Sequence, residues 1–221
     1  MGQMNNKMIV IDGVDGSGKG EQTRRLQQMM LAQGLPCILT REPGGSPAAE
    51  DVRHLLVNGD PDKWDSMTEL LLMYAARRAH LRDTILPALE RGDWVISDRF
   101  ADSSRAFQGI AGELGLQCVE QLHHLTLGDF QPDLVFILDI DETVALARAA
   151  ARGTGEDRFE KKGGEYHQKV RAAFRMIAAS NPQQYELIDA SGSIAEVNEA
   201  IVNIINKRFN LNLARQSSHG H

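Results

Sequence analysis

Short aliphatic segments alternate along the chain with longer segments in which apolar residues recur every three to four positions. The aliphatic segments predict β-strands, which we expect at residues 8–12, 36–40, 94–98, 134–139 and 185–189. The longer segments predict helices, which we expect at residues 21–32, 68–91, 143–152, 165–179 and 194–209. Strands alternating with helices form parallel sheets that are covered on both faces. The pattern therefore predicts an α/β fold with three layers, α/β/α, around a five-stranded parallel sheet.

Two segments lack this patterning. Residues 58–66 contain Gly59 and Pro61, which is typical of a surface connection between helices. Residues 153–164 are rich in Gly, Lys, Glu and Arg and have almost nothing to bury, so they predict a mobile lid. We expect one domain over residues 1–212, this lid included, followed by a polar tail over residues 213–221.

Composition narrows the class of protein. The chain has 221 residues, 42% hydrophobic and 24% charged, which suits one well-cored domain. Its net charge of −6 argues against nucleic acid as a partner. No apolar stretch approaches the roughly 20 residues that span a bilayer, so we expect no membrane contact. Cys37 and Cys118 lack metal-ligand spacing, which favours a reduced, cytoplasmic location.

The segment Gly13-Val14-Asp15-Gly16-Ser17-Gly18-Lys19-Gly20 joins the first predicted strand to the first predicted helix. Its glycines let backbone N–H groups turn inward around an anion, and Lys19 adds a charge for the β and γ phosphates. This is the pattern of a P-loop, so we expect ATP, with Mg²⁺, to bind here. Gly20 and Glu21 stand where a metal-binding hydroxyl residue usually follows the lysine.

Two acids end predicted strands at the edge where α/β sheets bind their ligands. Asp98 is followed by Arg99 and then by the polar run Asp102-Ser103-Ser104, whereas the rival acid, Asp139, has no arginine beside it. We therefore favour Asp98 over Asp139 as the residue that holds Mg²⁺. Either acid would alternatively serve as a helix cap.

The second predicted strand leads into Arg41-Glu42-Pro43-Gly44-Gly45-Ser46-Pro47, a rigid turn at the same edge. Arg53 follows in a predicted helix and is expected to point at this site. Farther along, helical spacing places Met73 over Arg77 and Tyr74 over Arg78. Either pair would stack on a flat base and bond its edge, or would form a core aromatic beside surface arginines.

Three arginines, Arg148, Arg152 and Arg158, surround and enter the predicted lid. A lid that closes with arginines expels water and offsets the negative charge of phosphates forced together. The alternative is a solvated basic surface.

Taken in order, these motifs resemble the thymidylate kinase family of nucleoside monophosphate kinases. The resemblance covers residues 7–209, and the motifs that carry it are the P-loop, Thr40-Arg41-Glu42-Pro43-Gly44-Gly45, Asp98-Arg99-Phe100 and Asp102-Ser103-Ser104 with Phe107-Gln108-Gly109. It implies phosphorylation of dTMP to dTDP by ATP, and a homodimer. The alternatives are another nucleoside monophosphate kinase, acting on dCMP, UMP or AMP, or a P-loop module that binds nucleotide without catalysis.

The resemblance also implies roles for residues that match the family's motifs. Asp15 would accept from the deoxyribose 3′-OH, Arg53 and Arg99 would hold the dTMP phosphate, and Glu42 would organise the phosphate and metal region. Arg77 would reach a thymine carbonyl, and Ser104 and Gln108 would reach the base edge. Phe107 would crowd the sugar where a 2′-OH would lie. Met73 stands where an aromatic residue usually stacks on the base, with Tyr74 beside it. The implied dTMP site also includes Pro43 and Ser103.

Members of the family differ in where their catalytic arginine lies. Some carry it in the P-loop, but this chain has Gly16 there and arginines in the lid, so it resembles the bacterial kind. The implied catalytic residues are Lys19, Asp15, Arg99, Arg152 and Arg158. The implied ATP site comprises the P-loop from Gly13 to Glu21 together with Arg148.

Overall fold

The computed structural model describes residues 7–141, 143–145, 147, 158–159 and 162–213. Its centre is a five-stranded sheet in the order β2-β3-β1-β4-β5, in which every pairing is parallel. This confirms the predicted α/β class, and each predicted strand is found within one residue of its bounds. The strands are β1 (Met8–Gly13), β2 (Cys37–Arg41), β3 (Trp94–Asp98), β4 (Leu134–Asp139) and β5 (Tyr185–Asp189).

Burial follows the position of each strand in the sheet. Every residue of the central strand β1 is buried, whereas the edge strands β2 and β5 also have half-buried and exposed positions. The register places Gly13 opposite Leu138, and Ile11 and Arg41 opposite Asp98. The carboxyl ends of β1, β2, β3 and β4 therefore meet at one edge, where the P-loop also begins.

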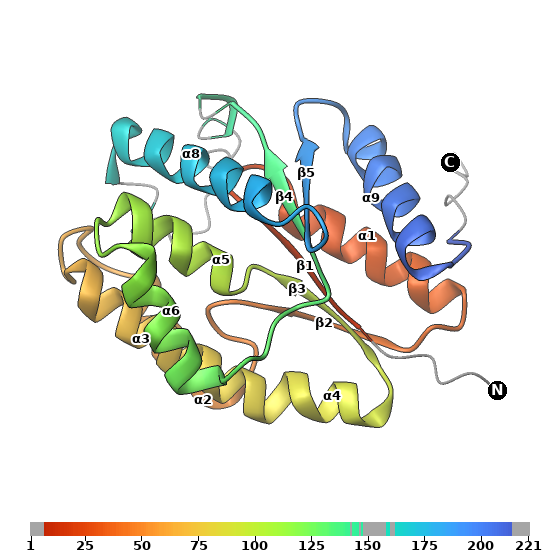
Figure 1. The fold of residues 1–221 in the computed structure, drawn as a ribbon, viewed down its shortest axis with the longest axis horizontal. Coiled ribbons are helices and arrows are strands. Elements are labelled where there is room, and N and C mark those ends of the chain that lie inside the picture. Colours follow the sequence, from red (N-terminus) through yellow and green to blue (C-terminus); the bar gives the residue numbers. More distant parts are fainter. Residues whose placement is uncertain (1–6, 142, 146, 148–157, 160–161, 214–221) are drawn as a thin grey trace.

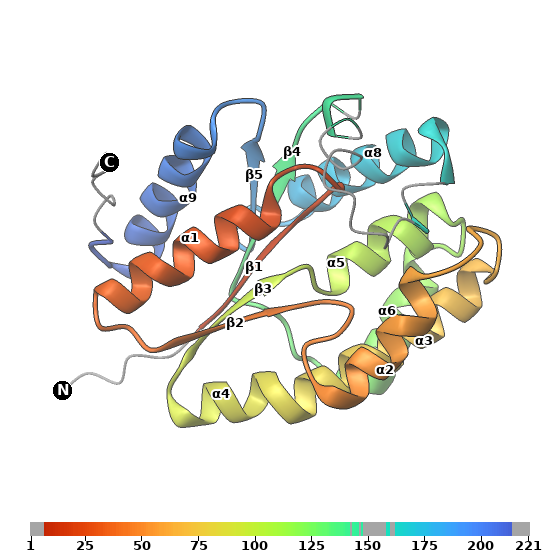
Figure 2. The ribbon, with the colours of Figure 1, turned by 180° about the vertical axis from the view of Figure 1, so that it is seen from behind.

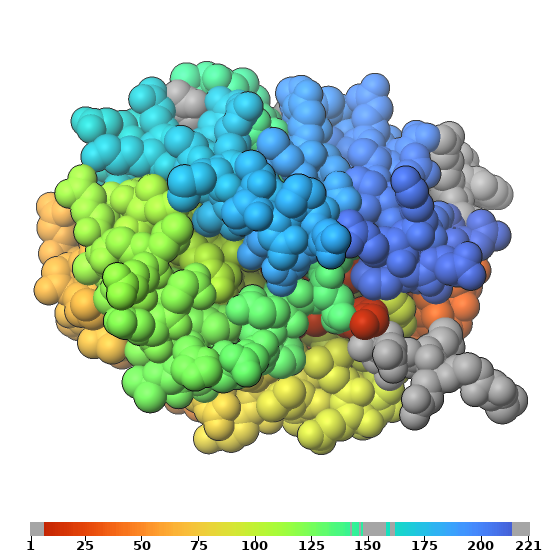
Figure 3. Space-filling model, in the orientation of Figure 1, coloured from red at the N-terminus to blue at the C-terminus, as the bar shows by residue number. Residues whose placement is uncertain are grey.

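Helices cover both faces of the sheet (Figures 1 and 2). One face packs against α1 (Lys19–Ala32) and α9 (Ile194–Phe209). The other packs against α4 (Leu86–Arg91), α5 (Ala101–Ser104) and α8 (Gly164–Ser180), and Figure 3 shows α8 spread over this face. Outside this layer lie α2 (Pro47–Val57), α3 (Ser66–His80) and α6 (Leu116–Leu127). No helix in the described part of the chain is both long and apolar enough to cross a membrane.

The helix predicted over residues 68–91 is continuous, but it contains a π-helical turn in its middle. It begins where Asp65 accepts a hydrogen bond from the Thr68 amide, and a π-helical turn, η1 (Leu81–Ile85), separates α3 from α4. Pro87 follows immediately and has no amide to donate, which accounts for the departure from regular α-helix at this point. A second π-helical turn, η2 (Arg105–Ala111), extends α5.

Residues 158 and 159 of the predicted lid differ from the expectation that this segment has almost nothing to bury. Arg158 is completely buried, and Phe159 packs edge-on against Phe107 with ring centroids 5.9 Å apart. The polar composition of this segment therefore hides a charged residue that is buried against α2, α3 and the loop between them. Residues 148–157 and 160–161, which include the end of the helix predicted over 143–152, lie outside the described residues.

Candidate active site

The P-loop turns its charged and polar groups toward the carboxyl edge of the sheet. Lys19 is buried, and its Nζ donates to the carbonyls of Gly13 and Val14 at 3.0 and 2.7 Å. Burial, together with the charge of Arg99, lowers the pKa of Lys19 to about 8. The Ser17 hydroxyl is buried and has no hydrogen-bond partner among the described residues. These groups fit an anion that would take over their hydrogen bonds.

Gly16 leaves no room for a side chain in this loop. Its φ is +84°, a conformation that favours glycine, and a Cβ added there would lie 1.9 Å from the carbonyl oxygen of Ala145. The segment after β4 thus closes directly onto the loop backbone. An arginine at position 16 is incompatible with this packing, so the P-loop itself offers no catalytic arginine there.

Arg99 lies at the centre of the site, just after β3. Its φ of +71° is a left-handed conformation that is strained for an arginine. Its guanidinium donates to Asp15 at 2.7 Å, Asp12 at 3.3 Å and the Ser103 hydroxyl at 2.9 Å. Burial would lower the pKa of Arg99, but the surrounding carboxylates outweigh burial and raise it. The site therefore holds a permanently charged donor beside the P-loop.

Asp98 has the surroundings expected of a metal ligand, and its rival does not. Burial raises the pKa of Asp98, and no described side chain hydrogen-bonds to its carboxylate. A Cβ on Gly20 would lie 3.4 Å from Asp98 Oδ2, so the carboxylate faces the start of α1. Asp139 is instead paired with Arg171 at 2.7 Å and Arg175 at 3.2 Å. This geometry fits Mg²⁺ at Asp98.

Glu42 differs from the expectation of a metal ligand, because both of its oxygens are already engaged by protein. Arg77 Nε donates to Oε2 at 2.6 Å, and His80 Nδ1 lies 3.0 Å from Oε1. Burial alone would raise the pKa of this carboxyl, but Arg77 and His80 outweigh burial and lower it. Among the described residues there is no cluster of three acidic, histidine or cysteine side chains that would hold a metal.

Arg77 is buried between aromatic rings, with its guanidinium carbon 4.5 Å from the Tyr74 ring centroid and 5.4 Å from that of Phe100. Besides its bond to Glu42, it donates to the Phe100 carbonyl and the Ser104 hydroxyl, both at 3.1 Å. Its remaining nitrogen, NH1, is buried and has no partner among the described residues. A rigid donor is thus left for a group that the described chain does not supply.

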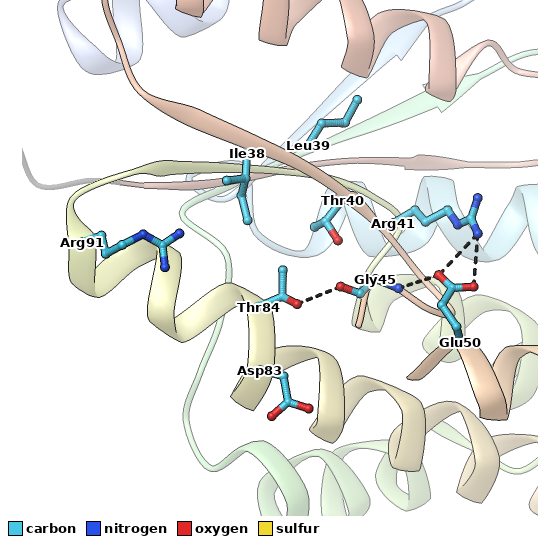
Figure 4. Close-up of a pocket in the computed structure, with 9 residues that line it drawn as sticks. All are labelled: Ile38, Leu39, Thr40, Arg41, Gly45, Glu50, Asp83, Thr84 and Arg91. Atoms are coloured by element: carbon cyan, nitrogen blue, oxygen red, sulfur yellow. Dashed lines mark hydrogen bonds and ion pairs between the residues drawn. The ribbon is translucent and has the colours of Figure 1, made fainter. Parts of the chain in front are cut away.

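The turn that follows β2 is fixed from both sides, as Figure 4 shows. Glu50 accepts from the Gly45 amide at 2.9 Å and pairs with Arg41, while Thr84 donates to the Gly45 carbonyl at 2.7 Å. These residues line a hollow of about 420 Å³ beside the edge strand. Arg53 NH1 donates to the Pro43 carbonyl at 2.6 Å, so it reaches the turn as expected.

The structure distinguishes between the two candidate stacking residues on α3. Tyr74 is 1% exposed, its hydroxyl lies 3.3 Å from His123 Nδ1, and one ring face is covered by Arg77. Met73 is only half-buried. Tyr74 therefore belongs to the core beneath Arg77, which leaves Met73 as the candidate stacking residue.

The helix α5 and its extension η2 carry the other predicted acceptor residues. Ser103 donates to Asp12 at 2.8 Å while accepting from Arg99. The Phe107 ring lies against the Arg99 guanidinium, with 5.3 Å between the ring centroid and the guanidinium carbon. Gln108 is buried and donates to Glu69 at 3.1 Å. Arg158 also reaches Glu69, whereas Arg148 and Arg152 lie outside the described residues.

Sequence analysis missed Asp12, Glu69 and His80, although all are completely buried and bonded to predicted site residues. One signal was available. Glu69, Met73, Arg77 and His80 recur at helical spacing and so share one face of α3. Charged residues along the inward face of a helix indicate buried ion pairs, but their partners lie far away in the sequence.

Comparison with known proteins is consistent with this geometry. The family model described as thymidylate kinase matches residues 11–201. A thymidylate kinase from Dinoroseobacter shibae is 50% identical over 86% of this chain and 92% of its own length, and one from Caulobacter vibrioides is 46% identical over 92% and 97%. A crystal structure of thymidylate kinase from Ehrlichia chaffeensis matches with a TM-score of 0.72 and 32% identity, covering 91% of this chain and 99% of that one. The chain belongs to the thymidylate kinase family.

Proposed function

We propose that the protein transfers the γ-phosphate of ATP to dTMP, giving dTDP, at the shared edge of β1, β3 and the turn after β2. The observation that carries this proposal is the buried NH1 group of Arg77, which lacks a partner among the described residues. A thymine carbonyl would satisfy it, with Met73 against the base and Ser104 and Gln108 at its edge.

Arg99 stands between the two substrates in this proposal. It donates to Asp15 in the P-loop and to Ser103 on the acceptor side. The acceptor is itself an anionic phosphate, so no strong general base is needed. Catalysis then consists of aligning two polyanions and neutralising the transferred group, a task that falls to Lys19 and Arg99. Arg53 would add a second cation on the dTMP phosphate, and Phe107 would exclude a 2′-OH.

Mg²⁺ completes the site in this proposal. Asp98 would hold it with the phosphates and water, since Gly20 offers no hydroxyl and Glu42 is engaged by Arg77 and His80. The ion supplies charge neutralisation for the phosphates when it is bound. From the resemblance, Arg148 and Arg152 would add positive charge from the lid.

We also propose that the protein acts as a homodimer through α2, α3 and α6, which lie together at the side of the molecule away from α9 (Figures 1 and 2). These helices expose large apolar side chains, namely Leu55, Met67, Leu71 and Leu125. Such a grouping is typical of a protein interface. Light scattering should give twice the chain mass, and Leu71→Glu should give the mass of one chain; a wild-type monomer would refute the dimer.

Two further expectations stay proposals. We propose one kinase domain over residues 1–212, because a single apolar core begins at Met8 and continues to Leu213, one residue past that bound. We propose a cytoplasmic location, because Cys37 and Cys118 are both free thiols.

The test is a panel of acceptors assayed with ATP and Mg²⁺, comprising dTMP, dUMP, dCMP, UMP and AMP. The proposal predicts ADP production that depends on the monophosphate and is fastest with dTMP. Faster reaction with any other base would assign the protein to a different acceptor. ATP binding without monophosphate-dependent ADP production would instead indicate a non-catalytic P-loop module.

A further inference from the structure

A buried carboxylate outside the predicted site links the acceptor pocket to the lid segment, residues 153–164. Glu69, on the inward face of α3, has a side chain that is 1% exposed. Its Oε1 accepts from Arg158 NH2 at 2.7 Å and from Lys162 Nζ at 2.6 Å, and its Oε2 accepts from Gln108 Nε2 at 3.1 Å. One side chain thus connects α3, η2 and the end of the lid segment.

Arg158 also donates to three backbone carbonyls. Nε donates to the Asp60 carbonyl at 2.9 Å, NH1 to the Leu56 carbonyl at 3.3 Å, and NH2 to the Pro61 carbonyl at 2.9 Å. All three nitrogens are therefore bonded, to the end of α2, to the loop that follows α2 and, through NH2, to Glu69. In this arrangement Arg158 fastens the chain to α2, α3 and the loop between them.

The hydrogen bond from Gln108 to Glu69 fixes the orientation of the Gln108 side-chain amide. The Glu69 carboxylate is paired with Arg158 and Lys162, and a carboxylate can only accept hydrogen bonds. The nitrogen of the Gln108 amide must therefore face it. The amide oxygen is then turned to the opposite side. No described residue hydrogen-bonds to that oxygen, so it is left to accept from a ligand.

Helical spacing aligns this pair with Arg77. Gln108 follows Ser104 by four residues, and Ser104 accepts from Arg77. On α3, Glu69 precedes Met73 by four residues, and Met73 precedes Arg77 by four. The Glu69 to Gln108 contact and the Arg77 to Ser104 contact are therefore neighbouring links between the same two helices, with Met73 between them.

This alignment distinguishes the pyrimidine bases. Thymine presents a donor at N3 and an acceptor at O4, whereas cytosine presents an acceptor at N3 and a donor at its amino group. An amide held with its oxygen toward the base matches the N3–H of thymine, and Arg77 matches O4. Cytosine would place its N3 acceptor opposite the amide oxygen and its amino donor opposite Arg77, so neither pair would form a hydrogen bond.

We propose that Glu69 is a positioning residue that holds the Gln108 amide in the orientation that accepts thymine and rejects cytosine, and that ties this amide to the end of the lid through Arg158 and Lys162. The inference rests on the proposed function. Glu69 acts through Gln108 and does not itself touch the substrate.

The experiment is a double-mutant cycle with kcat/KM measured for dTMP and for dCMP. Glu69→Gln should lower the ratio of the two values by about tenfold, the effect of one hydrogen bond in a buried site, mainly through KM for dTMP. Gln108→Ala should lower the ratio to a similar extent. In the Gln108→Ala background, Glu69→Gln should change the ratio no further, because its route to the base is gone.

Lys162→Met is the matched control. It removes a cation from Glu69 but leaves the contact with Gln108, so the ratio should stay at the wild-type value while the melting temperature changes. Should Glu69→Gln fail to fold, Glu69→Asp keeps the charge for Arg158, withdraws the carboxylate from Gln108 by one methylene, and should also lower the ratio.

Equal losses with both substrates would overturn the inference and leave Glu69 a purely structural residue. Additive effects of Glu69→Gln and Gln108→Ala on the ratio would overturn it as well. These outcomes are distinct from failure of the proposed function, which would appear as a wild-type protein that does not prefer dTMP.

Discussion

The P-loop forms its side of the site with backbone groups, whereas the proposed acceptor pocket is formed by buried charged side chains. Gly16 packs against the Ala145 carbonyl, and Lys19 bonds to loop carbonyls. On the acceptor side, Arg77, Glu42 and His80 form a buried network that leaves one buried donor without a partner among the described residues. A backbone site binds any triphosphate, but a site of fixed side chains can select a base.

The largest effect should come from the residue that joins the two regions. Arg99→Ala should lower kcat by about 10³-fold, because a charge placed for the transferred phosphate is lost, with a much smaller change in nucleotide affinity. Kinetics and equilibrium binding of dTMP measure the two separately. Arg91→Ala, which removes an exposed arginine paired with Asp93, serves as the control and should have no effect. A loss of binding that accounts for the whole effect would contradict a transition-state role.

The acceptor network should be sensitive to pH in a defined direction. Glu42→Gln should lower the free energy of unfolding by about 3 kcal/mol at pH 7, because it leaves Arg77 buried without its counter-charge. The pKa of Glu42 is lowered from its ordinary 4.5 in the folded protein, so its contribution is present above pH 4.5 and is lost as the pH falls through the folded value. The gap between wild type and variant should therefore shrink in acid.

Urea denaturation at a series of pH values measures that gap. The control is Glu113→Gln, since Glu113 is exposed and pairs only with exposed Lys169 among the described residues. Its unfolding free energy should match that of wild type throughout. A gap for Glu42→Gln that stays constant down to pH 3 would show that its charge does not stabilise the fold.

The P-loop should be sensitive to shape instead. Gly16→Ala and Gly18→Ala both place a side chain at positive φ, but an added Cβ meets the Ala145 carbonyl at position 16 and nothing within 4 Å at position 18. Strain alone should cost about 1–2 kcal/mol at either position. Gly16→Ala should cost clearly more, as measured by unfolding free energy and ATP affinity. Equal costs would remove the packing argument for Gly16.

The smallest effect should come from adding the hydroxyl group that position 20 lacks. A Cβ at position 20 lies in ordinary contact with Asp98 at 3.4 Å, so Gly20→Ser should fold normally. The Mg²⁺ concentration that gives half-maximal activity should change by less than about tenfold, because phosphates, water and Asp98 already hold the ion. Magnesium titration of the kinase rate measures this. Activity that appears only after the substitution would contradict the assignment of the ion to Asp98.

The two regions also differ in how far sequence predicts them. The strands were predictable within one residue because apolar runs such as Met8 to Ile11 are fully buried in a parallel sheet. The P-loop was predictable because its chemistry lies in one short segment. By contrast, α6 was missed because Gly115 gives it no capping side chain and its sequence contains weak helix formers such as Cys118, His123 and Thr126.

The acceptor network was only partly predictable, because its contacts join residues that are distant in the sequence. Resemblance indicated Glu42 and Gln108, but nothing local to either residue indicates His80 as the partner of Glu42 or Glu69 as the partner of Gln108. Arg158 illustrates the same limit. Its neighbours predicted an exposed lid, whereas a carboxylate 89 residues away and the carbonyls of another loop bury it.

The most direct test of the whole account is the stoichiometry of binding. Calorimetric titration of the protein with a non-hydrolysable ATP analogue and Mg²⁺, followed by dTMP, should give one site per chain for each nucleotide. The dTMP site should remain available when the analogue is saturating. Mutual exclusion of the two nucleotides would mean a single pocket, and the transfer of phosphate between neighbouring sites at this sheet edge would be contradicted.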